Sequence, residues 1–595
     1  MIPPEPSPSI SPTPSPVAGA RGLLLCILAA VASFVGAVLY LNALHNPFVY
    51  DDFRLVVDNP ALRDLSNLRG IVLRDILRPV VNLSYALDTA VWGNQPFGYH
   101  LTNILLHALN IALVFRVVLV ASEDRSRRPD QVIGAAASPT VAAFAAALLF
   151  AVHPMMTEAV GFVSGRSEVA CASLFLLAFL AGRRWLLLAG WGWWLACIGL
   201  WTVSLLAKET AAMLPFVLVA YSWLLLDPPP PQRWRLLLMG SPILVVSVAA
   251  VAVRVAVLLF VENRSGWFDW HWGPAAADAL WRYLGLFVYP HDQAVFHAID
   301  LRGPVAQVRI AASVAALLAV PWMVWRLRSI HSVMALGGLW FVLMLLPSSA
   351  LFALGVGEPL AEHRGYLPAV GLFMAWGSAM AMLWVRASDR TVMRVAVVTI
   401  AALFVFQLSV QTLVRNAIWS DPAALAQESV DLAPGHFFPL ILLGDAHRRA
   451  GRCDDAIEAY QKVLALRPEE ENVYDDLGIC FMQQHRFDEA EALMLELRGR
   501  NPASRDADVT LGLLATLKND LVGARAYFTQ ALDHHPDLAV AHGLLATVSG
   551  NLPPDKRRRA CEELGLMAED FDVGGCLARQ PTPAPVLLDG SPSGS

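Results

Sequence analysis

Long apolar stretches alternate with short polar ones over the first two thirds of the chain, and this pattern predicts a bundle of membrane-spanning helices. A span needs about 20 mostly apolar residues to cross roughly 30 Å of hydrocarbon. Eleven windows approach or reach this length: 22–43, 100–120, 138–153, 168–182, 185–203, 208–226, 236–260, 305–326, 332–351, 366–386 and 394–413. The apolar segment at 278–290 is short and aromatic, so we expect it to lie in the membrane interface without crossing.

Basic residues predict how these spans are oriented. The loops with a basic excess are 123–128, 183–184, 232–235, 326–328 and 385–390. With eleven spans all five fall on one side, which the positive-inside rule assigns to the cytoplasm. The loops on the opposite side are 44–99, 154–167, 261–304 and 352–365, and the C-terminal tail is expected there too. Interrupted apolar periodicity in the first of these loops predicts one or two amphipathic helices on the membrane surface.

The C-terminal tail repeats with a period of 34 residues. Three sets of residues share this spacing: Pro434, Pro468, Pro502 and Pro536; Gly444, Gly478 and Gly512; and Ala456, Ala490 and Ala524. The period is typical of the tetratricopeptide repeat, in which each repeat is a pair of helices. We expect the small residues where paired helices touch, and Tyr460, Met494 and Phe528 in the gap between neighbouring pairs. Three repeats start near 437, 471 and 505, with a degenerate one from about 539 and a partial one near Trp419.

Composition supports this organisation and excludes other classes. The chain has 595 residues, 56% hydrophobic and only 16% charged, with a mean hydropathy of +0.50, whereas a soluble protein carries roughly a quarter charged residues. The net charge of -6 and the lack of long basic blocks argue against nucleic acid as a partner. We predict an all-α protein with four regions: a disordered Pro/Ser-rich tail (1–20), a transmembrane domain (21–415), a tetratricopeptide-repeat domain (416–567) and a disordered tail (568–595).

The seven cysteines form no CxxC motif and no Cys/His metal spacing. Four of them lie in the soluble tail: Cys453, Cys480, Cys561 and Cys576. A disulfide between them would need an oxidising compartment, so their pairing stays open.

Ionisable residues that the membrane pattern does not explain gather on one predicted face, that of the four external loops. Such residues are costly at a membrane and are functional candidates by default. They are Asp51, Asp52, His100, His153, Glu158, Arg166, Glu168, Lys208, Glu209, Glu362, His363 and Arg364. A carboxylate there could act as general base toward a hydroxyl, and the cations could bind the phosphate of a lipid seated in the bilayer.

Structural roles compete with this hypothesis. Arg166 and Glu168 could form an interfacial ion pair, Lys208 could extend toward the headgroups, and His107, two turns deeper, is expected to pack between helices. Asp51 and Asp52 are harder to explain in this way, because adjacent like charges repel and neither is needed to end a span. Which of the two is the base stays open.

Six motifs occur in a fixed order before the repeats: FVYDDFRLVVDNP, RPVVNLSYALD, PFGYHLTNILLHALN, LLFAVHPMMTEAVGFVSGRSE, LLAKETAAMLP and EHRGYLPAVGLF. Together they resemble the transmembrane and tetratricopeptide-repeat-containing O-mannosyltransferases and their bacterial relatives, over most of residues 40–550. The resemblance implies a GT-C glycosyltransferase fold. It also implies an inverting transfer of a sugar, in this family mannose, from a polyprenyl-phosphate carrier to Ser or Thr hydroxyls of extracytoplasmic proteins.

The resemblance further implies roles for individual residues. The acidic residue expected in the first external loop is matched by Asp51 and Asp52, one of which would accept the proton of the acceptor hydroxyl. The donor phosphate would be held by Arg166, Lys208 and Arg364, then by His100 and His153, with Glu158, Glu209 and Glu362 in support. No cofactor or metal is expected, although a paired Asp could hold a divalent ion.

Partners and location follow from the same expectations. The partners are the polyprenyl-phosphate donor, a protein acceptor, a peptide or protein bound by the repeats, and membrane lipid. The protein is expected in a bacterial inner membrane with its repeats in the periplasm. Three to four repeats are fewer than the animal members carry, so the sugar and the acceptor stay open, as does the oligomeric state. The alternatives are a membrane-anchored repeat scaffold without catalysis and a lipid-carrier transporter, which would place its charges near the midplane.

Overall fold

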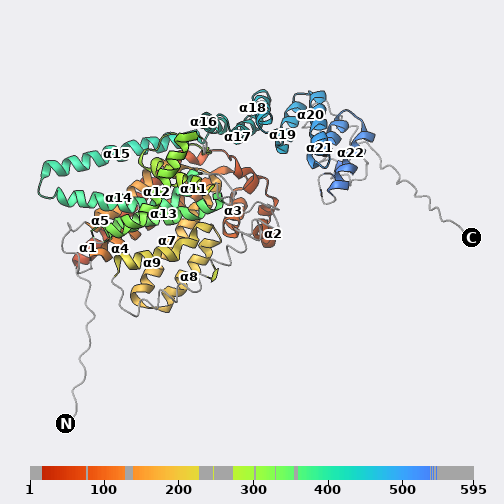
Figure 1. The fold of residues 1–595 in the computed structure, drawn as a ribbon. Helices are drawn as coiled ribbons and strands as arrows, with labels where there is room; N and C mark the ends of the chain where they lie inside the picture. The colour runs from red at the N-terminus through yellow and green to blue at the C-terminus, as the bar shows by residue number, and fades with distance from the viewer. Residues whose placement is uncertain are drawn as a thin grey trace, which may run out of the picture. The chain divides into compact units, whose positions relative to one another are not determined.

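The computed structural model describes residues 16–74, 78–126, 138–226, 272–299, 303–328, 330–353 and 360–535, with isolated positions at 245–246, 538, 541, 544–545 and 548. The chain divides into two compact units, Met1–Glu428 and Ser429–Ser595. Every regular element in the described ranges is helical, so the predicted all-α fold class is confirmed (Figure 1).

The first unit contains most of the helices. They are α1 (Pro16–Leu39), α2 (Leu68–Arg74), α3 (Pro79–Trp92), α4 (Pro96–Ser126), α5 (Pro139–Val152), α6 (Thr157–Gly161), α7 (Arg166–Leu188), α8 (Trp191–Leu205), α9 (Leu214–Leu225), α11 (Trp272–Val288), α12 (Gly303–Leu327), α13 (Ser332–Ala353), α14 (Tyr366–Arg386) and α15 (Thr391–Ile418), followed by α16 (Pro422–Leu432). Short irregular turns of helix connect them: η1 (Leu41–His45), η2 (Phe53–Val57), η3 (Pro60–Arg63), η4 (Pro154–Met156), η5 (Val163–Gly165), η6 (Glu209–Met213) and η7 (Glu362–Gly365).

Within the described ranges, seven helical segments are long and apolar enough to cross a membrane. They are Ala20–His45, Pro96–Ser126, Val163–Leu188, Gly303–Leu327, Ser332–Ser349, Glu362–Arg386 and Thr391–Ile418. An eighth is available if Pro139–Val152 and Pro154–Gly161, bent by 62°, form one broken span. The predicted count of eleven is higher because 185–203 and 208–226 fold as the shorter apolar helices Trp191–Leu205 and Glu209–Leu225. In addition, 236–260 lies outside the described residues except for positions 245–246.

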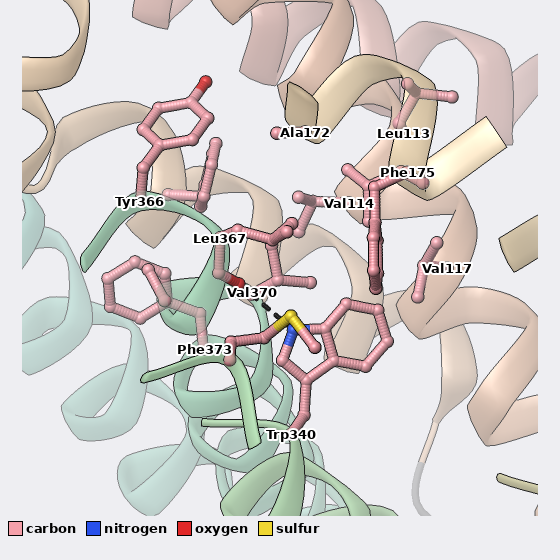
Figure 2. Close-up of a cluster of buried hydrophobic side chains, with 14 of the residues drawn as sticks. Leu113, Val114, Val117, Ala172, Phe175, Trp340, Tyr366, Leu367, Val370 and Phe373 are labelled. Carbon is pink, nitrogen blue, oxygen red and sulfur yellow. Dashed lines mark hydrogen bonds between the residues drawn. The ribbon is translucent and has the colours of Figure 1, made fainter. Parts of the chain in front are cut away.

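The centre of the first unit is an apolar core in which α4, α5, α13 and α14 lie side by side (Figure 1). Figure 2 shows Phe175 of α7 against Trp340 of α13, with ring centroids 5.6 Å apart, and Phe373 of α14 in the same apolar cluster. The Trp340 indole N–H donates to the Leu367 carbonyl at 3.1 Å. Gly337 and Gly371 face one another so closely that a Cβ on either would overlap the other's carbonyl oxygen, so small residues set this helix spacing.

The segments predicted to be external contain short helices joined by irregular stretches such as 290–299. The first loop folds into η1, η2, η3, α2 and α3, in line with the amphipathic helices predicted within 44–99. The short aromatic segment predicted at 278–290 falls in α11, which contacts α12 and α13. Residues 261–271 and 300–302 of loop 261–304 lie outside the described residues, as do both chain ends and, apart from single positions, the repeat from about 539.

The described part of the second unit, up to His535, contains three helix pairs. The pairs are α17 (Phe437–Arg449) with α18 (Cys453–Leu466), α19 (Glu471–Gln483) with α20 (Phe487–Arg500), and α21 (Arg505–Leu517) with α22 (Leu521–His534). Their first residues coincide with the three predicted repeat starts. Cys453 and Cys480 are free thiols buried in the core of this unit.

The contact made by the large residue of each repeat differs from the prediction. The Tyr460 ring packs directly on Gly444, and the Phe528 ring packs on Gly512. Both contacts lie inside one helix pair, not between neighbouring pairs as expected. The periodic glycine is therefore explained by the ring that covers it, because any side chain there would collide with that ring.

Candidate active site

The two adjacent aspartates lie on a tight turn of the first predicted external loop. Tyr50 adopts a φ of 46°, in the left-handed region that costs a residue with a Cβ roughly 1–2 kcal/mol. Asp52 follows with a fully buried side chain. Its Oδ2 accepts from the Val49 N–H at 3.1 Å, and its Oδ1 accepts from the Ser164 N–H at 2.8 Å and the Ser164 hydroxyl at 2.5 Å. Asp52 thus fixes the strained turn to the segment before α7.

Asp51 differs from its neighbour in exposure. Its side chain is 37% exposed, and its carboxylate lies 3.7 Å from the Arg54 guanidinium. The turn therefore separates the pair into one buried carboxylate that holds structure and one that a solvent-borne group can reach.

Burial also changes the acidity of Asp52. Loss of solvent raises its pKa to about 7, and the charge of Asp51 acts in the same direction. The hydrogen bonds from Ser164 and Val49 oppose this rise because they stabilise the ionised form. Asp52 therefore changes charge near neutral pH.

Ser164 is held in turn by two helices. The Tyr85 hydroxyl of α3 donates to the Val163 carbonyl at 3.1 Å, and the Asn103 amide of α4 donates to the Phe162 carbonyl at 3.0 Å. Ser164 was not among the sequence candidates, although it lies within the motif GFVSGRSE.

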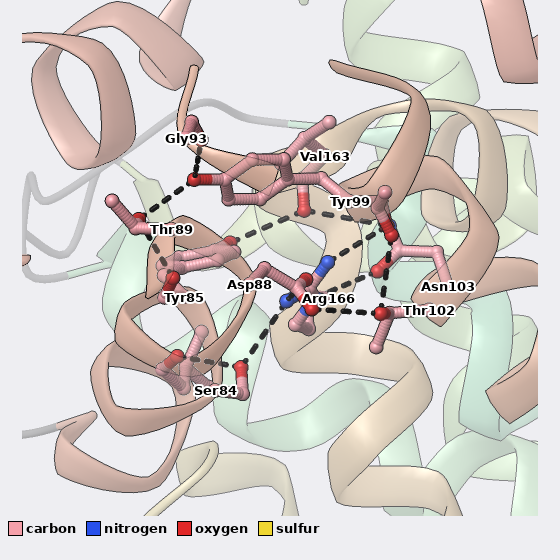
Figure 3. A network of polar contacts seen from close by, with 12 residues as sticks. Ser84, Tyr85, Asp88, Thr89, Gly93, Tyr99, Thr102, Asn103, Val163 and Arg166 are labelled. Carbon is pink, nitrogen blue, oxygen red and sulfur yellow. Dashed lines mark hydrogen bonds and ion pairs between the residues drawn. The ribbon is translucent and has the colours of Figure 1, made fainter. Parts of the chain in front are cut away.

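Arg166 is the centre of the buried polar network in Figure 3. Its guanidinium donates to Asp88 Oδ2 at 2.5 Å, to Asn103 Oδ1 at 2.9 Å and to the Tyr99 carbonyl at 2.7 Å. The side chain has no exposed surface. This geometry favours a structural role, joining α3, α4 and α7, over the predicted phosphate contact. Asp88, its partner, was not among the sequence candidates.

Lys208 is also buried against a carboxylate, with its Nζ 2.6 Å from Glu168 Oε1. The next residue, Glu209, has a side chain 40% exposed and lies 3.8 Å from Arg78. Arg78, Lys208 and Arg364 all act electrostatically on Glu209. Two of the predicted cations therefore converge with a third, Arg78, which is 35% exposed and which sequence reasoning missed although it begins the motif RPVVNLSYALD.

The two other predicted glutamates organise the start of α14. Glu158 accepts from the His363 N–H at 2.9 Å and contacts its Nδ1 at 2.7 Å. Glu362 accepts from the Ala294 N–H at 2.8 Å and contacts Gln293 at 2.6 Å and His297 at 3.0 Å. These bonds fix the segment that carries Arg364, which agrees with a supporting role.

The predicted histidines are bonded to backbone. His100 Nε2 lies 3.1 Å from the Asn46 carbonyl, and His153 Nε2 lies 3.0 Å from the Phe287 carbonyl. Both rings are buried. They position the first external loop and α11, and neither presents an exposed nitrogen to a phosphate.

The acidic turn and the cations meet around one tyrosine. Asp52, Arg78 and Arg166 all act electrostatically on the Tyr85 hydroxyl. Arg78 also lies 3.8 Å from Glu209, on which Lys208 and Arg364 act, so Asp52 and these cations share the electrostatic surroundings of Arg78. The structure therefore assembles in one region residues that lie more than 300 positions apart in sequence.

Within the described ranges, no three His, Cys, Asp or Glu side chains are grouped so that they could hold a metal ion. The expectation of no metal stays a prediction.

The fold and the site define a multi-pass helical membrane protein that also carries a repeat unit. Comparison with known proteins identifies the proteins to which this chain is similar. The tetratricopeptide repeat family matches residues 447–511. Human protein O-mannosyl-transferase TMTC1 is 26% identical over 530 residues, which cover 77% of this chain and 57% of the human protein. Drosophila melanogaster Tmtc3 is 24% identical over 575 residues (82% and 60%), and Drosophila Tmtc1 is 35% identical over 195 residues (31% and 21%).

These matches confirm the resemblance to the O-mannosyltransferases that the ordered motifs indicated. The matched regions span about three fifths, or less, of the length of these relatives.

Proposed function

We propose that this protein is a membrane glycosyltransferase that moves a sugar, in the first instance mannose, from a polyprenyl-phosphate carrier to a Ser or Thr hydroxyl of a protein. The relatives bear the name of protein O-mannosyl-transferases, which supports the reaction class. The observation that carries the proposal is the exposed carboxylate of Asp51 on a turn pinned by buried Asp52, linked through α3 to a group of cations.

We assign a role to each charged residue of the site from the exposure of its side chain. Asp51 acts as the general base, because a base must reach the hydroxyl that it deprotonates. Asp52 positions that turn. Arg78 and Arg364, which are partly exposed, hold the phosphate of the donor, and buried Lys208 adds positive potential behind them.

The reaction is a single displacement. Asp51 takes the proton of the acceptor hydroxyl while the oxygen attacks the anomeric carbon from the face opposite the phosphate. The bond from that carbon to the phosphate oxygen breaks, and the bonding electrons leave with the polyprenyl phosphate. Arginine and lysine cations stabilise the negative charge that develops on the phosphate. The configuration at the anomeric carbon is inverted.

The repeat unit supplies the acceptor in this proposal. Stacked tetratricopeptide pairs form extended surfaces that bind peptides or partner helices. We place the protein in a bacterial inner membrane, with the aspartate turn and the repeats both on the periplasmic side, because a lipid-borne sugar and a secreted protein meet there.

The test is transfer by purified full-length protein in lipid nanodiscs, given polyprenyl-phosphate mannose with a radiolabelled sugar and an envelope protein extract. Label should enter protein with the wild type and not with Asp51→Asn at equal protein level. Transfer that survives in the double Asp51→Asn, Asp52→Asn variant would end this mechanism. Reporter fusions at residues 52 and 480 should both report the periplasm, and a cytoplasmic result at either would overturn the topology.

A further inference from the structure

Three aromatic rings form a stack beside the catalytic turn. Tyr50 lies over Phe162 with centroids 6.4 Å apart and planes at 22°, and Phe162 lies over Trp419 at 5.5 Å and 29°. Exposure falls along the stack, from 37% at Tyr50 to 5% at Phe162 and 2% at Trp419. The inner rings therefore form a rigid support for an outer ring that borders solvent.

The backbone of Tyr50 indicates that this ring is required there. At a φ of 46° glycine would be free of strain, yet the chain places a large aromatic residue at this position. The bonds of Asp52 to Val49 on one side and to Ser164 on the other hold the conformation. Strained backbone of this kind, kept by surrounding bonds, is concentrated at functional sites.

We propose that the Tyr50 ring is the platform on which the sugar of the lipid-linked donor lies. The inference rests on the proposed function and adds to it the group that recognises the sugar itself. One face of a hexopyranose presents C–H groups, which pack on the face of an aromatic ring, while its hydroxyls remain in water. Tyr50 directly precedes Asp51, so a sugar on this ring would have its anomeric carbon near the proposed base.

A sugar platform should affect lipid binding differently from a residue that binds the phosphate. Tyr50 should contribute to binding of the sugar-bearing lipid and contribute nothing to binding of the same lipid phosphate without sugar. Phosphate ligands such as Arg364 should affect both lipids.

The experiment measures the affinity of polyprenyl-phosphate mannose and of polyprenyl phosphate for the full-length protein in nanodiscs. Two variants remove the ring while accepting the left-handed backbone, Tyr50→Gly and Tyr50→Asn. Tyr50→Phe keeps the ring, and Phe97→Ala removes a different aromatic side chain that is also 37% exposed. Binding of the sugar-free lipid at wild-type affinity serves as the test of folding.

We expect the wild type to prefer the mannose-bearing lipid, and both ring-free variants to lose about tenfold in affinity for that lipid alone. Tyr50→Phe and Phe97→Ala should keep the preference. A wild type without any preference would contradict the proposed function itself. A wild type with the preference, retained by Tyr50→Gly or Tyr50→Asn, would overturn the platform and leave the transferase intact.

Discussion

The two units of this protein differ in how deeply their ion pairs are buried. In the first unit, ion pairs such as Arg166–Asp88 and Lys208–Glu168 are buried and join residues 78 and 40 positions apart. In the second unit, pairs such as Lys462–Glu458 are exposed and four positions apart on one helix. Buried pairs are strongly destabilising to break, whereas exposed pairs contribute little. The bundle therefore uses fully buried pairs to fix segments around the site, whereas pairs in the repeats, such as Arg448–Asp476, stay partly exposed beside an apolar core.

The largest effect is expected at Asp51. Asp51→Asn should reduce transfer by roughly 10²–10⁴-fold, the range typical of a lost general base, and should leave thermal unfolding unchanged because the carboxylate is partly exposed. The measurement is label transfer at saturating donor, beside thermal unfolding of the purified protein. Asp64→Asn, an exposed aspartate of the same loop, is the matched control and should retain full activity. Equal losses in both variants would contradict a specific role for Asp51.

The next effect tests the buried charges. Arg166→Met leaves Asp88 unpaired in the network of Figure 3, so it should destabilise the fold by roughly 3–5 kcal/mol. Thermal unfolding in nanodiscs should show a clear drop, and Asp88→Asn added to Arg166→Met should recover part of it because the unpaired charge is removed. Lys462→Met in the repeats breaks an exposed pair and should leave the unfolding temperature unchanged. A larger drop for Lys462→Met than for Arg166→Met would reverse the comparison between the units.

The third effect tests the apolar contacts of the repeats. Gly444→Ala drives a methyl group into the Tyr460 ring, while at Gly478 the nearest atom is the flexible end of Met494, 3.0 Å from the new Cβ. Overpacking against a fixed ring costs about 1–3 kcal/mol, and a flexible methionine yields more readily. Gly444→Ala should therefore lower the unfolding temperature of the repeat unit more than Gly478→Ala does, measured on the full chain. The same loss in both would mean that the covering residue does not matter.

The contrast between the units also explains what the sequence could predict. Repeat starts at 437, 471 and 505 follow from a short period, because each repeat folds from contacts within itself and with its neighbours. The acidic pair and Arg364 could be selected as unusual charges near a membrane. Ser164, Asp88 and Arg78 could not be assigned roles, because their partners lie far away in sequence and only the packed bundle brings them together.

The sequence also could not predict which charged side chains are buried. Arg166 and Lys208 look like free cations in sequence, and the structure encloses both against carboxylates. A charge pattern indicates where polar groups gather, but which of them remains accessible depends on tertiary packing.

The smallest effect concerns the pH dependence that this packing creates. Burial raises the pKa of Asp52 to about 7, and the Ser164 hydroxyl holds it below the value that burial alone would produce. If ionised Asp52 is needed to accept the N–H bonds that fix the turn, transfer should rise as pH increases through about 7. Stability should move the other way: the unfolded chain releases this proton near its ordinary pKa of about 3.9, so folding is favoured less as pH rises from there to about 7.

The Ser164→Ala variant tests whether ionisation of Asp52 causes this pH dependence of transfer. Removing the hydroxyl removes a bond that stabilises the ionised carboxylate, so the pKa of Asp52 should rise and the activity profile should move to higher pH, by about one unit. The control is Ser66→Ala, which removes a hydroxyl bonded to exposed Asp64 at 2.7 Å in the same loop and should leave the profile in place. A shift of the activity profile to lower pH in Ser164→Ala would contradict the explanation that ionisation of Asp52 causes transfer to rise through about pH 7. A shift to higher pH would tie the catalytic turn to a residue 112 positions away, which is the long-range dependence that distinguishes the bundle from the repeats.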